Sequence, residues 1–233
     1  PVVKGMPLFD LQRTEVLRGP QGSIFGRNTP AGVVKFQTVR PSQELDGFAR
    51  VSYGTYDNVD FKAAVGGGLT DTLSARASLL YQSQSDWIDN TFTGQSDALG
   101  GQTTWAGRVQ LLWEPSEKFT ALFNVHGWDL DGTARIFRAN ILEKGTDELV
   151  AGFAQDEVSQ DGLNQQEIRA YGGVLKLDYD FGSATLTSVT GYETLDKMYS
   201  RGDIDGGYGA VFAPPSGPGL IPFPSESADG LPK

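Results

Sequence analysis

Two runs of alternating residues, one face apolar and the other carrying the polar and charged side chains, make up most of the stretch 104–128 of this chain. Trp105 and Trp113 fall on one face of an extended segment, and Arg108 falls on the other. A period of two residues is typical of a β-strand, because successive side chains point to opposite faces of a sheet. A polar reversal over 114–118 separates two such runs. The stretch therefore predicts a β-hairpin with one apolar face.

The aromatic residues of this hairpin lie toward the ends of its apolar face, and smaller aliphatic residues lie between them. Trp105 and Trp113 bracket the first strand, and Phe119 opens the second. This distribution is typical of strand pairs whose apolar face meets lipid and whose aromatic residues form girdles at the two interfaces. A soluble β-sandwich can show the same alternation, so the hairpin alone does not decide between them.

The period of two recurs from Asp46 onward and predicts about seven strands. The predicted strands span residues 47–53, 59–69, 73–82, 104–113, 119–126, 171–181 and 184–193. The short turns lie at 70–72, 114–118 and 182–183, and the outer connections lie at 54–57, 86–102, 129–166 and from 201 onward. Bacterial outer-membrane barrels alternate short periplasmic turns with longer outer loops in this way.

The turn at Gly182–Ser183 decides the phase of the last predicted strand. If these two residues form the turn, Phe181 opposes Ala184 on the same face. Leu186 then points outward and Glu193 points inward. In this phase the last strand, like the others, has no charged residue on its outward face.

Charged residues segregate to the inward faces of these strands. Those on the inward faces are Arg50, Asp60, Lys62, Arg76, Arg108, Lys176, Asp178, Asp180 and Glu193. An outward Lys or Arg near the middle of the membrane costs about 2–4 kcal/mol. The sequence therefore predicts an all-β fold, an antiparallel transmembrane β-barrel with a polar lumen. Seven strands leave two unpaired edges that hydrocarbon does not tolerate, so we expect a segment of a larger barrel.

The composition of the chain argues against several other classes of protein. The 233 residues include 30 Gly, 11% aromatic residues and no Cys, with a formal net charge of -10. No apolar run reaches the roughly 18 residues of a transmembrane helix. The absence of Cys excludes a disulfide framework or a thiolate metal site. The negative charge argues against a nucleic-acid partner.

Residues 1–41, which we call the head, differ from the rest of the chain. They are basic and rich in Gly and Pro, whereas residues 140–167 are acidic. The head predicts a short strand at Glu15–Arg18, a β-turn over Gly19–Gly22 and a second strand over Val33–Arg40. It is too small to bury a core of its own.

The run from Thr14 to Asn28, with Ala31–Val34 after it, resembles the end of the plug domain in TonB-dependent outer-membrane receptors. The motif positions are Glu15, Arg18, Gly19, Pro20, Gly22, Gly26, Asn28 and Gly32. The alternative is an ordinary Gly-Pro turn between strands. In that family a plug fills a barrel of about 22 strands. The resemblance implies that residues 1–41 are the C-terminal part of a plug domain and residues 42–233 the N-terminal part of the β-barrel.

The resemblance also implies a function. Members of this family take up a scarce ligand, most often a ferric siderophore, across the outer membrane of a Gram-negative bacterium. Other ligands of the family, such as cobalamin, glycans or aromatic compounds, stay open. A TonB–ExbB–ExbD complex supplies the energy. We further expect contact with outer-membrane lipid, a monomer when the protein is complete, and neither a cofactor nor catalysis. Two rivals stay open, namely a passive porin and a soluble, secreted β protein that binds carbohydrate.

Two sets of residues are candidates for holding the plug. The resemblance suggests that Glu15 and Arg18 lock it to the barrel wall through ion pairs, and the alternative is that both are solvated strand ends. The second set consists of lumen-facing charges, namely Arg50, Lys62, Arg76, Arg108, Lys176 and Asp178.

Other motifs carry little chemistry. His126, the sole histidine, has no clustered partners for a metal, so we expect it to form hydrogen bonds in the lumen. Asp129–Gly132 and Asp203–Gly206 resemble the opening of calcium loops but lack the bidentate Glu, which favours solvated acids. Arg201–Asp203 spells an adhesion tripeptide that we attribute to chance. The sequence has no nucleophile elbow and no phosphate loop.

Overall fold

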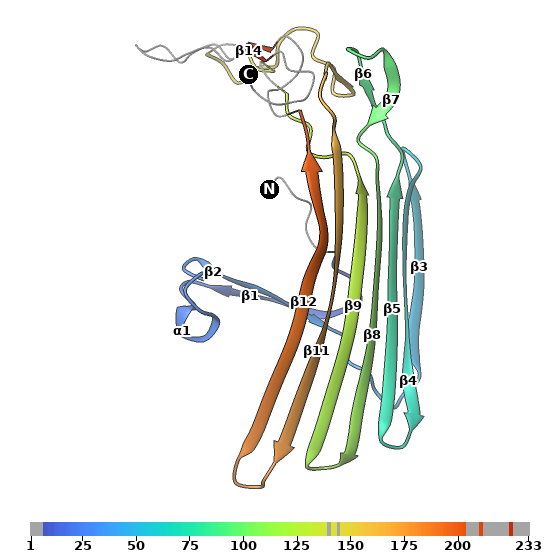
Figure 1. Ribbon diagram of the computed structural model, residues 1–233, viewed down its shortest axis with the longest axis vertical. Helices are drawn as coiled ribbons and strands as arrows, with labels where there is room; N and C mark the ends of the chain where they lie inside the picture. The colour runs from blue at the N-terminus through green and yellow to red at the C-terminus, as the bar shows by residue number, and fades with distance from the viewer. Residues whose placement is uncertain (1–6, 139–140, 144, 204–209, 212–223, 226–233) are drawn as a thin grey trace.

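The computed structural model describes residues 7–138, 141–143, 145–203, 210–211 and 224–225. Seven long antiparallel strands form one sheet, which we call the wall (Figure 1). They are β3 (Asp46–Gly54), β4 (Asn58–Thr70), β5 (Leu73–Gln84), β8 (Gln102–Ser116), β9 (Phe119–Gly132), β11 (Gln165–Asp180) and β12 (Thr185–Arg201). Each pairs with the next in chain order, so the predicted all-β fold with seven strands is confirmed.

The two faces of the wall follow the predicted alternation. In β8, Thr104 and Gln110 are buried, whereas Trp105 and Trp113 on the opposite face are about half exposed. The head lies on the face of Thr104 and Gln110, which we call the inward face. The other face is the outward face. The strands of the wall extend beyond the head in both directions (Figure 1).

The predicted phase of the last strand is correct. The backbone N–H of Phe181 donates to the carbonyl of Ala184 at 2.9 Å, which closes the turn. Gly182 has a φ of 87°, a conformation that costs glycine little. Tyr179 therefore pairs with Leu186, and Glu193 falls on the inward face.

The head forms a separate antiparallel hairpin, β1 (Leu11–Arg18) with β2 (Gly32–Thr38). It projects from the inward side of the wall (Figure 1). The predicted β-turn at Gly19–Gly22 is wrong. The amides of Gly19 and Gln21 instead donate to the carbonyls of Ala31 and Thr29, and the chain reverses later, through the helical turn α1 (Gly22–Phe25).

The long connections at one end of the wall contain more structure than predicted. Residues 86–102 include β6 (Ile88–Asn90) and β7 (Gln95–Leu99), and β10 (Glu157–Val158) from the next long connection pairs in parallel with β6. Asn90 Nδ2 donates to the carbonyl of Gln160 at 2.8 Å, and the Gln160 amide donates back to Asn90 Oδ1 at 3.1 Å. The two connections therefore pack as one unit.

The remaining elements are short. β13 (Ala210–Val211) pairs with β14 (Pro224–Ser225), and an isolated bridge joins Leu142 and Leu149. The second calcium-like motif continues into residues 204–206, which lie outside the described residues. Within the described part of the chain, no helix is long and apolar enough to cross a membrane.

Candidate functional site: the contact between head and wall

The contact between head and wall centres on the carboxylate of Asp10. Arg76 donates to it twice, from Nε at 2.8 Å and from Nη2 at 2.7 Å. Ser78 Oγ adds a third hydrogen bond at 2.5 Å. Arg76 and Ser78 lie two residues apart in β5, so the period of the strand presents both to the head. A two-pronged pair of guanidinium and carboxylate is among the stronger polar contacts in proteins.

Arg76 also holds a second carboxylate. Its Nη1 donates to Asp46 Oδ2 at 3.0 Å, across strand β4. The register places Asp46, Gly66 and Arg76 in one row, and the central glycine leaves room for the Arg76 side chain. The side chains of Asp10 and Arg76 are 1% and 4% exposed, whereas that of Asp46 is 61% exposed. The ion pair of Arg76 with Asp10 is therefore buried, whereas the ion pair of Arg76 with Asp46 is open to solvent at Asp46.

Asp10 has an infrequent backbone conformation and an ionised carboxylate. Its φ is 50°, a left-handed value that side-chain-bearing residues adopt infrequently. Burial raises the pKa of the carboxyl, but hydrogen bonds from Arg76 and Ser78 outweigh it, so the pKa lies below its ordinary value. Asp10 therefore stays ionised at neutral pH.

Phe9 adds an apolar contact beside the ion pair. Its side chain is buried with Leu80 and Ala106 of the wall, and Trp128 packs against the same cluster. The guanidinium of Arg108 lies 4.6 Å from the centre of the Phe9 ring, and Nη1 donates to the Phe9 carbonyl at 3.4 Å. A cation over an aromatic face is favourable, more so where water is excluded.

The C-terminal end of the second hairpin strand, β2, is held at the same place. Gln110, which is almost fully buried, donates from Nε2 to the carbonyl of Val39 at 2.7 Å. Thr38 Oγ1 donates to Gln110 Oε1 at 3.5 Å, and the amide of Val39 donates to the carbonyl of Asp10 at 3.1 Å. Both ends of the hairpin thus meet the wall at β5 and β8.

The predicted lock residues lie elsewhere in the head. Glu15 pairs with Arg13 at 2.6 Å and with Lys35 at 3.4 Å, all on the hairpin itself. Arg18 is exposed, and its carbonyl accepts a hydrogen bond from Gln21. A role of Glu15 and Arg18 in locking the plug stays a prediction.

The other motif positions form the reversal of the hairpin. Pro20, Gly22, Gly26 and Asn28 are exposed, and Gly19 is partly exposed. Gly32 has a φ of 142°, and a Cβ there would lie 2.4 Å from the carbonyl oxygen of Leu17. Glycine is therefore required at position 32 by close backbone approach.

The other predicted lumen charges have partners on the wall itself or lie near its edge. Lys62 pairs with Asp60 at 3.0 Å, and Lys176 pairs with Asp178 at 2.9 Å. Arg50 is exposed on β3, where it is opposite Lys62 in the register. Arg76 and Arg108 are the two of this set that contact the head.

His126 forms the hydrogen bonds expected of it. Nδ1 lies 3.0 Å from Asn124 Oδ1, and Nε2 lies 2.9 Å from Glu193 Oε1. Glu193 reaches across β11 because Gly172 lies between them, and a Cβ on Gly172 would overlap the Glu193 carboxylate. Among the described residues, no group of three or more His, Cys, Asp and Glu side chains could hold a metal ion.

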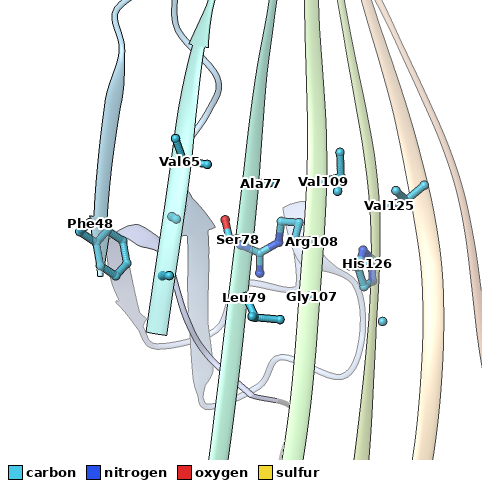
Figure 2. A pocket seen from close by; sticks show the side chains of 13 residues that line it. Phe48, Val65, Ala77, Ser78, Leu79, Gly107, Arg108, Val109, Val125 and His126 are labelled. Carbon is cyan, nitrogen blue, oxygen red and sulfur yellow. The ribbon is translucent and has the colours of Figure 1, made fainter. Parts of the chain in front are cut away.

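The outward face is hollowed at the same height. Val65, Leu79, Val109 and Val125 border a cavity of about 780 Å³ whose remaining lining includes small residues such as Gly107 (Figure 2). The four aliphatic side chains are all exposed. These uncharged side chains suit the acyl chains of a membrane, whereas Arg108 and His126, which also line the cavity, make their polar contacts on the inward side.

Comparison with known proteins gives relatives of one kind. No family model matches the chain. It is 31% identical over 112 residues to the pesticin receptor of Yersinia pestis, a match that covers 48% of this chain and 16% of the relative. It is 28% identical over 98 residues to the vitamin B12 transporter BtuB of Vibrio vulnificus, covering 42% and 16%. The matched part thus spans about a sixth of the length of these relatives.

Solved structures agree on the fold. The ferric yersiniabactin uptake receptor FyuA from Yersinia pestis superposes with a TM-score of 0.67 and 22% identity, covering 80% of this chain and 28% of that one. The ferric-catecholate import receptor Fiu from E. coli K12 superposes with a TM-score of 0.68 and 15% identity, covering 90% and 32%.

In sequence and in fold the chain is similar to TonB-dependent outer-membrane receptors. By this likeness the head corresponds to the end of a plug, and the wall corresponds to the first part of a barrel. The place of the chain is the outer membrane of a Gram-negative bacterium. The domain boundary at residues 41–42 stays a prediction, and β3 begins at Asp46. The relatives are named as receptors and transporters, not as enzymes.

Proposed function

We propose that the complete receptor imports a scarce extracellular ligand by displacing its plug. One observation carries the proposal: the head lies on the inward face of the wall, held there by the buried contact of Asp10 with Arg76 and Ser78. Separating a buried ion pair is costly. Opening the passage therefore needs work, and we infer that a TonB–ExbB–ExbD complex supplies it.

The ligand we propose is a ferric siderophore. Relatives named as receptors for pesticin and for ferric pyoverdine, and solved structures of siderophore receptors, support this choice. A relative named as a vitamin B12 transporter keeps cobalamin as the second candidate. Outer-membrane lipid would surround a monomeric barrel, and we propose no cofactor and no catalytic role.

A passive porin is the main rival. A porin conducts through an open lumen, whereas the inward face of this wall is covered by the head at β5 and β8. A soluble carbohydrate-binding protein is less compatible with the exposed aliphatic and aromatic residues of the outward face.

Energy-dependent uptake tests the proposal. Cells that express the complete receptor should accumulate labelled ferric siderophore, and a proton uncoupler should abolish accumulation without abolishing surface binding. Uptake that survives the uncoupler would favour the porin. Growth on single iron sources, with cobalamin uptake in parallel, would separate the two ligand candidates.

The predicted role of Glu15 and Arg18 has its own test. If Arg18 locks the plug to a part of the barrel beyond this wall, Arg18→Ala should raise passive entry of a bulky antibiotic. Lys35→Ala is the matched control, because Lys35 is an exposed cation whose ion pair stays within the hairpin. Equal entry in both variants would remove Arg18 from the lock.

A further inference from the structure

Arg76 is shared between two carboxylates that belong to different parts of the molecule. Nε and Nη2 face Asp10 in the head, and Nη1 faces Asp46 at the start of β3. The planar guanidinium offers five N–H donors in a fixed fork, so it can serve both partners at once. Only one of these partners moves if the head leaves the wall.

Asp46 is part of the wall by its register. It pairs with Gly66 of β4, which in turn pairs with Arg76 of β5. A Cβ on Gly66 would lie 3.2 Å from both Cβ and Cγ of Arg76, closer than ordinary contact. The glycine therefore keeps open the path by which Arg76 crosses β4 to reach Asp46.

Release of the head would leave Arg76 without a counter-ion if Asp10 were its only partner. A buried charge that loses its counter-ion is strongly unfavourable. Asp46 is already bonded to the same guanidinium, and at 61% exposure it stays hydrated in both positions of the head. Asp10 and Asp46 also repel each other, since both carboxylates bind one cation.

We propose that Asp46 is a standby counter-ion that lowers the cost of freeing Asp10 from Arg76, and so eases plug release. This inference rests on the proposed function, in which the head leaves the wall during uptake. It assigns opposite roles to two acids on one arginine. Asp10 closes the contact, whereas Asp46 makes the contact reversible.

Removing the charge of Asp10 and removing that of Asp46 should change the rate of head release in opposite directions. Ala106 is 3% exposed and lies beneath Phe9 on the wall, so Ala106→Cys reports release of the head by its reaction with a thiol reagent. The complete receptor would carry this as its only cysteine and would be labelled in purified form. Asp10→Asn should raise the labelling rate by about a hundredfold or more. Asp46→Asn should lower it by about threefold, since Asp46 is exposed.

Two further variants serve as controls for the labelling experiment. Asp46→Glu restores a carboxylate and should return the labelling rate toward that of the parent. Asp60→Asn removes a wall carboxylate whose partners are Lys62 and Gln82, away from the head, and should leave the rate unchanged. Faster labelling of Asp46→Asn, or an unchanged rate, overturns the proposal.

Uptake measured on the same variants separates this inference from the proposed function. Asp46→Asn should slow siderophore uptake by about threefold at unchanged ligand affinity. If the labelling rates follow the prediction while the parent shows no energised uptake, the transport proposal fails and the role of Asp46 stands. If the parent imports ligand but Asp46→Asn labels as fast as Asp10→Asn, the transport proposal stands and the role of Asp46 fails.

Discussion

The two faces of the wall differ in burial at the height of the head. Leu80 and Gln110 on the inward face are almost fully buried, whereas their chain neighbours Leu79 and Val109 on the outward face are exposed. Adjacent residues in the same strands thus have opposite surroundings. Strand propensity cannot account for this, because it acts on both neighbours alike. What each face touches, a plug in a polar lumen or lipid, sets which side chains it can carry.

The ion pairs of the head also differ in their expected contribution to stability. Removing one partner of a buried ion pair costs about 3–5 kcal/mol, whereas an exposed pair contributes about 0–1 kcal/mol. Asp10 with Arg76 belongs to the first class, and Glu15 with Lys35 belongs to the second. The anchor of the head is therefore at its base, near the wall.

The largest effect is expected at Asp10. Asp10→Asn should weaken the contact of head and wall by about 3–5 kcal/mol, because Arg76 loses its buried counter-ion. Passive entry of a bulky antibiotic into de-energised cells should rise in this variant. Asp60→Asn, an inward carboxylate away from the head, should leave entry unchanged. Equal entry in the two variants would contradict the role of Asp10.

Leu80 and Leu79 form a matched pair across the wall. Leu80→Ala should destabilise the receptor by about 2–5 kcal/mol, because it opens a cavity beneath Phe9. Leu79→Ala, on the outward face, should cost about 1 kcal/mol or less. Thermal unfolding in detergent micelles compares them, and a larger loss for Leu79→Ala would reverse the assignment of the faces.

Val109 tests the outward face directly. It lies between Trp105 and Trp113 in β8, away from both ends of the strand. Val109→Lys should cost about 2–4 kcal/mol if this position is near the membrane midplane. Equilibrium folding into lipid vesicles measures the cost, with Val109→Ile as the control. Wild-type stability of the lysine variant would argue against lipid at this position.

The smallest effect is expected at a partly exposed ion pair on the inward face of the wall. Lys176 pairs with Asp178 on β11, where both side chains are partly exposed. Lys176→Ala should change the free energy of unfolding by less than about 1 kcal/mol. The same unfolding assay applies, and a loss like that of Leu80→Ala would mean that Lys176 has a contact outside the described wall.

The period of two was enough to predict the wall. It gave seven strands, the turn at Gly182–Ser183 and the faces of Trp105 and Glu193. Lipid and lumen impose one rule on every strand, so the signal accumulates along the chain. The short elements β6, β7, β10 and α1 were missed, because elements of two to five residues are too short to show a period.

The anchor of the head could not be predicted from the sequence. The inward charges identified Arg76 and Arg108 as candidates, but Asp10 lies 66 residues from Arg76 along the chain. Sequence motifs favoured Glu15 and Arg18, which lie in the family signature. One signal for Asp10 was available, since it and Glu15 are the acids of an otherwise basic head. Geometry was still needed to select it.

Tryptophan quenching by brominated phospholipids tests the central claim most directly, that the wall separates lipid from a lumen that holds the head. Trp105 is on the outward face, and Trp128 is on the inward face beside Phe9. Complete receptors that retain one of these indoles would be reconstituted in bilayers. The account predicts strong quenching of Trp105 and little quenching of Trp128. Equal quenching of both, or an unquenched Trp105, would contradict it.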